Sequence, residues 1–189
     1  IFIYHPGQRF SALRLSEFVA FLKKYPHLEC FLDIKQNDPR LVKTAIKSIV
    51  DNRLLDRVYF TFCQVRIPWM KSETSGKSLL RAKRFEPRIK THLIATFPFS
   101  LPRLAEKYHP DFISFGWLQD SLLSRVFFKG IIIPFFNLPK QIRETQQMDV
   151  RVLAGISNQE EDIRYFADMG VDAVMTENVD AAFKAIQET

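Results

Sequence analysis

Residues 29–35 read Glu-Cys-Phe-Leu-Asp-Ile-Lys, a short apolar run that ends in an acidic residue and a lysine. Its length and its aromatic and branched side chains are typical of a buried strand. Asp38 and Pro39 follow, and this pair suits the N-cap and first turn of a helix. Residues 41–50 then place apolar side chains on one helical face. The stretch therefore predicts a strand followed by an amphipathic helix.

This strand and helix unit recurs along the chain. Several of the apolar runs are nearly continuous, as strands buried on both faces require. The predicted strands are 29–35, 57–62, 91–97, 111–116, 130–135, 151–156 and 172–177. Because helix-like segments separate them, the pattern predicts an α/β fold with a parallel sheet or barrel.

Two helices have clear local signals. Residues 15–22 space their apolar side chains as a helix does. Further along, Asn158 and Glu161 have the spacing of a capping box, and Gly170 suits a left-handed C-terminal cap. The buried face of this second helix is expected to hold Ile163, Phe166 and Ala167.

Composition places the chain among ordinary globular proteins. It has 189 residues, 47% hydrophobic and 25% charged, which predicts a single domain over 1–189. The longest apolar run, 131–136, is far too short to cross a bilayer, so no transmembrane segment is expected. The sequence favours a soluble, cytoplasmic protein without fixing the compartment or the oligomeric state. It opens on Ile1 within a strand-like run, and we expect residues upstream.

The cysteines argue against a zinc site, and the net charge indicates an anionic partner. Cys30 and Cys63 lie inside apolar runs without zinc-site spacing, so they are expected to be buried thiols. The net charge of +6 fits a phosphorylated substrate, an anionic membrane surface or nucleic acid. The densest basic stretch, 77–90, is interpreted as a solvated helix face. It has no nucleic-acid-binding motif beside it, so no nucleic-acid partner is predicted.

The end of the first predicted strand carries the main candidate site. Asp33 and Lys35 are two positions apart, and side chains alternate along a strand, so both are expected to face the mouth of a barrel. A carboxylate there can hold a divalent cation, and an ammonium can bind a phosphate oxygen. An ordinary ion pair at a strand end remains the alternative.

Three further features of the sequence are candidates for a chemical role. His5 precedes a Pro-Gly turn, where its imidazole is either a proton carrier or a solvated surface group. Residues 75–78 end like a phosphate-binding loop, but Lys71 stands where its first glycine belongs, which excludes that motif. Trp69, Trp117 and the aromatics of 97–99 are candidates for a pocket lining, and the irregular stretch 64–76 is expected to border the site.

Several of these segments resemble one family. Residues 31–35 resemble the third barrel strand of the glycerophosphodiester phosphodiesterases, Asn-Ile-Glu-Ile-Lys, and residues 59–62 resemble the fourth. Residues 151–180, which include Gly-Val-Asp-Ala-Val-Met-Thr-Glu at 170–177, are similar to the closing segment of that family. Residues 1–6 resemble the strand that ends in its second catalytic histidine.

The resemblance implies a TIM (β/α)8-type barrel whose first one or two strands are missing from this chain. It implies hydrolysis of glycerophosphodiesters to glycerol phosphate and an alcohol, with His5 as a catalytic acid and base. Asp33 would bind a divalent metal, Ca²⁺ or Mg²⁺, and Lys35 would bind the substrate phosphate.

The chain departs from the family pattern at several positions. Asp33 replaces a glutamate, Pro6 an aspartate, Gly155 a tryptophan and Glu177 an aspartate. These changes leave an alternative open, in which the chain is a catalytically inactive relative that acts as a binding or regulatory module.

Overall fold

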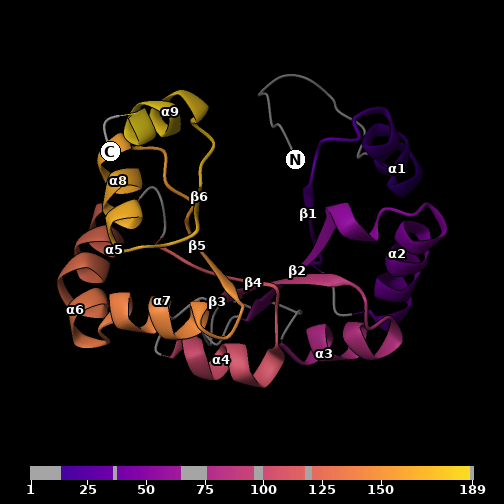
Figure 1. The fold of residues 1–189 in the computed structure, drawn as a ribbon, viewed down its shortest axis with the longest axis horizontal. Helices are drawn as coiled ribbons and strands as arrows, with labels where there is room; N and C mark the ends of the chain where they lie inside the picture. The colour runs from indigo at the N-terminus through magenta and orange to yellow at the C-terminus, as the bar shows by residue number, and fades with distance from the viewer. Residues whose placement is uncertain (1–13, 36–37, 65–75, 96–99, 118–120, 188–189) are drawn as a thin grey trace.

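The computed structural model describes residues 14–35, 38–64, 76–95, 100–117 and 121–187. Their strands form one six-stranded sheet in the order β1-β2-β3-β4-β5-β6, with every neighbouring pair parallel. The strands are β1 (Cys30–Asp33), β2 (Val58–Gln64), β3 (Lys90–Ala95), β4 (Phe112–Phe115), β5 (Arg151–Gly155) and β6 (Ala173–Met175). The sheet curls, and the helices lie outside the curl (Figure 1). This is the arrangement of part of a TIM barrel.

Helices connect the successive strands. The α-helices are α1 (Leu15–Lys24), α2 (Pro39–Asp51), α3 (Gly76–Phe85), α4 (Leu101–Tyr108), α5 (Leu122–Phe127), α6 (Ile133–Phe135), α7 (Leu138–Gln146), α8 (Glu160–Asp168) and α9 (Val179–Gln187). A short 3₁₀ turn, η1 (Leu55–Arg57), precedes β2, and a π-helical segment, η2 (Phe128–Ile132), joins α5 to α6.

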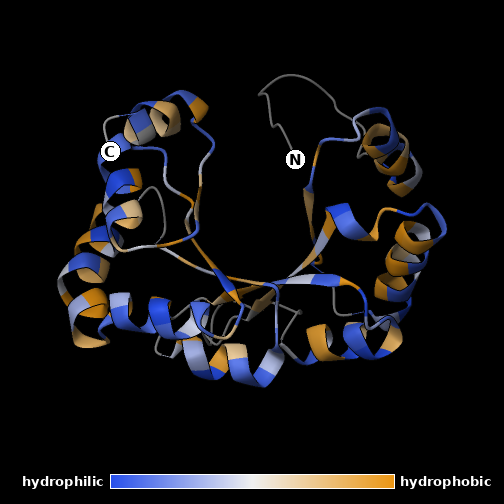
Figure 2. Cartoon of the chain, viewed as in Figure 1, coloured by the Kyte–Doolittle hydropathy of each residue, from blue (hydrophilic) through white to orange (hydrophobic). Residues whose placement is uncertain are grey.

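The main hydrophobic core lies between the outer face of the sheet and these helices. Phe60 and Phe62 of β2 and Ile113 of β4 are completely buried there. The helices contribute their apolar stripes, including Ile46 from α2 and Leu79 from α3. Figure 2 shows hydrophobic residues distributed along both the strands and the helices. Burial of this face fixes which side chains of each strand point outward and which point into the curl.

The two local predictions at the start of the chain are confirmed. The helix expected over 15–22 is α1, with Val19 and Leu22 buried. The helix expected after Asp38 is α2, and the Asp38 carboxylate accepts a hydrogen bond from the Arg40 backbone N–H at 2.8 Å. Pro39 occupies the first turn, where its missing N–H costs no hydrogen bond.

The strand predicted over 130–135 is wrong. These residues lie in η2 and α6, and they continue the helix that begins at Leu122. A short apolar run fits a buried strand and a helix equally well, because periodicity alone does not separate the two. The helix that precedes the run and Pro134 at the start of α6 settle the choice in favour of helix.

The cap predicted for the later helix is also wrong in part. α8 begins at Glu160, after Gln159, which makes no side-chain cap. The Asn158 Oδ1 atom instead accepts a hydrogen bond from the Glu177 backbone N–H at 2.8 Å, and so ties the loop after β5 to the loop after β6. Ile163 and Phe166 are buried as expected, but Ala167 is exposed. Gly170 has the left-handed φ of 84° that was predicted.

Among the described residues, no single helix has the length and apolar character needed to cross a membrane. Two helical stretches, Leu122–Phe135 and Leu138–Gln146, reach that threshold only when taken together, and they meet at a bend of 67°.

Candidate active site at the carboxyl end of the sheet

Asp33 and Lys35 lie at the carboxyl end of β1. In parallel barrels, the carboxyl ends of the strands form one rim, where substrates bind. Asp33 is the last residue of β1, and its Oδ2 atom lies 2.5 Å from Lys35 Nζ. The Asp33 side chain is 35% exposed and that of Lys35 is 79% exposed, so both groups are open to a ligand. The structure therefore brings together two of the three predicted site residues. His5 lies outside the described residues.

A row of buried polar side chains begins beside Asp33 and crosses the inner face of the sheet. Asp33 is in register with Thr61 of β2, and Thr61 is in register with His92 of β3. Thr61 Oγ1 lies 3.1 Å from His92 Nδ1, and His92 Nε2 lies 2.8 Å from Ser114 Oγ on β4. Each of these three side chains is at most 3% exposed. The row links three adjacent strands by hydrogen bonds under the rim.

Burial keeps the imidazole of His92 neutral. It lowers the pKa of His92 from 6.5 to about 4, since the charged form would lose its hydration. A neutral imidazole has one donor and one acceptor nitrogen, and the hydroxyl groups of Thr61 and Ser114 can serve either. Buried between these two hydroxyl groups, His92 has the surroundings of a structural histidine.

We expect His92 to make stability depend on pH. The unfolded chain binds a proton at His92 below pH 6.5, whereas the folded chain binds one only near pH 4. The free energy of unfolding is therefore unaffected by this group above pH 6.5 and falls as the pH drops toward 4. At about 1.4 kcal/mol per pKa unit, the fall amounts to about 3 kcal/mol. Urea unfolding of the wild type and His92→Gln across this range should give a difference that changes with pH. A constant difference would contradict a neutral buried His92.

Aromatic and basic side chains close the opposite, amino-terminal end of the inner face. Phe31 stacks on Tyr59 with ring centroids 5.1 Å apart, and Tyr59 meets Phe112 edge to face at 4.9 Å. The Arg151 guanidinium lies 3.8 Å from the centre of the Phe112 ring and donates a hydrogen bond to Tyr59 Oη at 3.2 Å. No local sequence pattern indicates this layer, because its members come from four different strands. Ring stacking and cation–π contact fill this end, so the open polar groups lie toward the carboxyl rim.

Trp117 does not line a pocket at the rim. It is 7% exposed and stacks on Phe166 of α8 with centroids 4.4 Å apart. The pocket role predicted for it is therefore wrong, because its ring completes the core between β4 and α8. Trp69 and residues 97–99 lie outside the described residues.

Within the described ranges, no three His, Cys, Asp or Glu side chains come together in a way that could hold a metal ion. Asp33 offers one carboxylate, which does not by itself hold a divalent cation.

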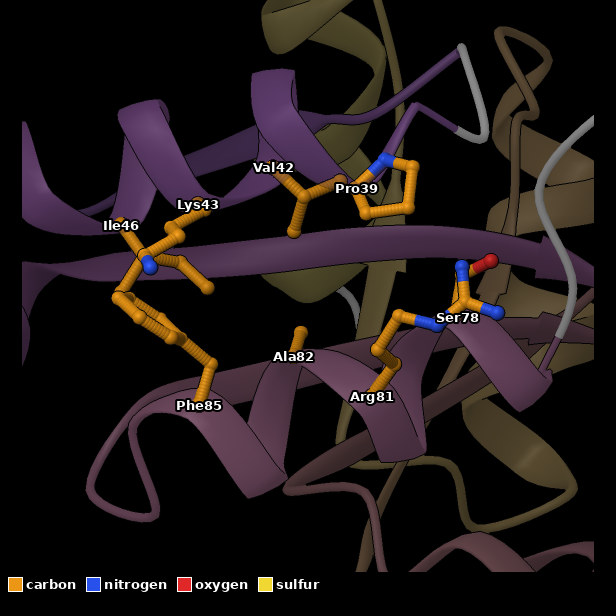
Figure 3. A pocket seen from close by; sticks show the side chains of 8 residues that line it. All are labelled: Pro39, Val42, Lys43, Ile46, Ser78, Arg81, Ala82 and Phe85. Carbon is orange, nitrogen blue, oxygen red and sulfur yellow. The ribbon is translucent and has the colours of Figure 1, made fainter.

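A separate cavity of about 140 Å³ lies between α2 and α3 (Figure 3). It is lined by Pro39, Val42, Lys43, Ile46, Ser78, Arg81, Ala82 and Phe85. The Lys43 Nζ atom lies 4.9 Å from the centre of the Phe85 ring. All of these residues belong to the two helices, so this cavity is separate from the strand ends and from Asp33.

Solved structures that share this fold include several phosphodiesterases. A protein from Silicibacter pomeroyi DSS-3, described as a glycerophosphoryl diester phosphodiesterase, superposes with a TM-score of 0.68 at 18% identity, over 93% of this chain and 56% of that one. A glycerophosphodiester phosphodiesterase from Parabacteroides distasonis ATCC 8503 has a TM-score of 0.62 at 11% identity, over 92% and 64% of the two chains. The resemblance stated from the sequence is confirmed for the fold.

A third structure carries a reaction product. It is a phosphodiesterase from Oleispira antarctica in complex with sn-glycerol-3-phosphate, with a TM-score of 0.56 at 16% identity, over 90% of this chain and 60% of that one. This chain thus spans less than two thirds of the length of these three phosphodiesterases. No protein-family profile and no curated protein sequence matches it.

The same fold also serves a different reaction. The 3-hexulose-6-phosphate synthase from Salmonella typhimurium superposes with a TM-score of 0.56 at 17% identity, over 92% of this chain and 77% of that one. Fold alone therefore does not fix the reaction, which depends on the residues at the rim.

Proposed function

We propose that the protein hydrolyses glycerophosphodiesters to glycerol phosphate and an alcohol. The observation that carries this proposal is the exposed Asp33 and Lys35 pair at the carboxyl end of β1. The sheet that presents the pair is shared with glycerophosphodiester phosphodiesterases, one of them bound to sn-glycerol-3-phosphate. A phosphodiester at this rim would meet an ammonium group beside a carboxylate, which suits charge on the phosphoryl oxygens.

Each proposed site residue has one role. Lys35 binds a phosphoryl oxygen and stabilises the negative charge that develops on it during hydrolysis. His5 accepts a proton from the attacking oxygen and returns one to the leaving alcohol oxygen. Asp33 orients Lys35 through their ion pair and offers its carboxylate to a cation. The hydrogen-bonded row of Thr61, His92 and Ser114 holds the adjacent strands in place beneath them.

We propose a divalent cation, Ca²⁺ or Mg²⁺, as the cofactor. Such an ion would neutralise phosphate charge when bound. Asp33 is one oxygen ligand for it. The described residues do not complete the set, so the other ligands would have to come from outside them.

The test is hydrolysis of glycerophosphocholine and glycerophosphoethanolamine by the full-length protein. The rate is measured from the amount of free alcohol released. We expect turnover with Ca²⁺ or Mg²⁺ that stops when a chelator is added. His5→Ala should lower kcat by roughly a hundredfold or more, the usual contribution of a general acid or base. His27→Ala, an exposed histidine on a turn, serves as the matched control and should leave turnover unchanged. Turnover that His5→Ala does not alter would remove His5 from the mechanism.

The second candidate is a binding module without catalytic activity. The observation in its favour is that Lys35 and Asp33 satisfy each other at 2.5 Å, while the described residues form no metal cluster. Under this alternative, folded protein supplied with metal gives no turnover, yet it binds glycerol phosphate in calorimetry. Lys35→Met would then weaken that binding.

A further inference from the structure

The segment formed by α5, η2 and α6 exposes an apolar surface to solvent. Its most exposed large side chains are Leu122 at 68%, Leu123 at 80%, Val126 at 59%, Phe127 at 45%, Ile131 at 51% and Phe135 at 79%. These six residues are called the outer apolar face. In Figure 1 the segment lies outside the curl of the sheet, and in Figure 2 it is largely hydrophobic in colour.

The outer apolar face reverses the usual pattern of a surface helix. Such helices turn charged side chains to water and apolar ones to the core. Here the two basic side chains of the segment reach toward α8: Arg125 Nη1 and Lys129 Nζ lie 3.1 and 2.7 Å from the carboxylate of Asp162, which is 4% exposed. They stay 22% and 33% exposed beside Leu122 and Val126. Phe128 and Ile132 are buried on the same inner side. The segment is thus anchored to the protein by charges and aromatic packing, and its outer side is left apolar.

The helix geometry keeps this face continuous. Exposed positions come in pairs every four residues, at 122–123, 126–127, 130–131 and 134–135, and all eight residues are apolar, glycine or proline. A repeat of four drifts around a regular helix of 3.6 residues per turn. The wider π turn of Phe128–Ile132 counters that drift and holds the pairs on one side.

Charge indicates what covers this face. Residues 120–144 contain four cations, Arg125, Lys129, Lys140 and Arg143, and two acidic residues, Asp120 and Glu144. Asp162 offsets one of these charges, and Lys140 lies 3.6 Å from Glu144 one turn on. The whole chain carries a net charge of +6. Apolar residues with cations beside them suit the interface of an anionic membrane, whereas a second copy of this chain would bring two cationic segments together.

We propose that the outer apolar face docks the protein on the surface of a bilayer that contains anionic phospholipid. Leu122, Leu123 and Phe135 enter the boundary between headgroups and acyl chains, and the partly exposed Arg125 and Lys129 beside Leu122 and Val126 contact lipid phosphates. The docking does not depend on the proposed hydrolysis, since the face lies on the outer helices and shares no residue with Asp33 and Lys35.

Vesicle sedimentation tests this proposal. The full-length protein is mixed with vesicles of equal parts phosphatidylglycerol and phosphatidylcholine, or of phosphatidylcholine alone. We expect it to pellet with the anionic vesicles only and to be released in molar sodium chloride, which screens surface charge. Leu123→Glu and Phe135→Glu should each lower the partition coefficient by about tenfold or more, because each places a charge in an apolar boundary.

Leu41→Glu is the matched control, since Leu41 is 45% exposed on α2, away from the outer apolar face. It should bind vesicles as the wild type does, and circular dichroism should show all three variants folded. The proposal is overturned if the two Glu variants on α5 and α6 bind as the wild type does, or if uncharged vesicles bind equally well. A dimer in the absence of vesicles that Leu123→Glu dissociates would assign the face to a second copy instead.

Discussion

Asp33→Asn is expected to lower kcat/KM for glycerophosphodiesters by about a thousandfold, since the neutral amide keeps the side-chain shape but no longer attracts the proposed cation or orients Lys35 through an ion pair. Lys35→Met should lower it by roughly a hundredfold, because the phosphoryl oxygens lose one cation. Both groups are exposed, and an exposed ion pair adds little to stability. We therefore expect unchanged unfolding curves beside the loss of activity.

The controls are Asp51→Asn and Lys47→Met, exposed residues of α2 that lie far from the strand ends along the helix. Steady-state kinetics of all four variants and the wild type measure whether kcat/KM falls only in Asp33→Asn and Lys35→Met. Wild-type kcat/KM in Asp33→Asn would show that β1 does not contribute to the site. Loss of folding in that variant would point to a structural role for its ion pair.

Gly116→Ala is expected to lower the free energy of unfolding by about 3 kcal/mol or more, since a methyl group there forces backbone apart. A Cβ atom at Gly116, just after β4, would overlap the carbonyl oxygen of Gly155 at the end of β5. That oxygen is main chain and cannot rotate away as a side chain can. Urea denaturation followed by circular dichroism measures the effect.

Gly130→Ala is the control for this prediction. No atom lies within 4 Å of a Cβ built at Gly130, and the residue is part of the helical segment η2. Alanine favours helix over glycine by up to about 1 kcal/mol, so this variant should be neutral or slightly more stable. Equal destabilisation by the two variants would mean that the contact between Gly116 and Gly155 is not tight.

Sequence patterns predicted the elements whose signals are local. Six of the seven predicted strands are present. The run at 130–135 failed because a helix begins eight residues earlier and continues through it. Asn158 has the correct spacing for a cap, but its side-chain Oδ1 atom instead accepts a hydrogen bond from the backbone N–H of Glu177, which follows β6.

The candidate site was predictable only where it is contiguous in sequence. Asp33 and Lys35 are two residues apart, and strand alternation is enough to pair them. His92 meets Thr61 and Ser114 only through the register of three strands, which no local pattern contains. Trp117 was assigned to a pocket because it follows a strand, but its burial depends on Phe166, which lies on α8.

The order of the six strands in the sheet is their order along the chain. Each strand therefore pairs with the strand that precedes or follows it in the sequence. The entropy lost in closing the connecting segments stays small for this reason. During synthesis, the sheet can grow one strand at a time behind the ribosome, without waiting for a distant segment. Of the two outer strands of the described sheet, β1 would emerge first, so its free edge would be available for pairing from the beginning of folding.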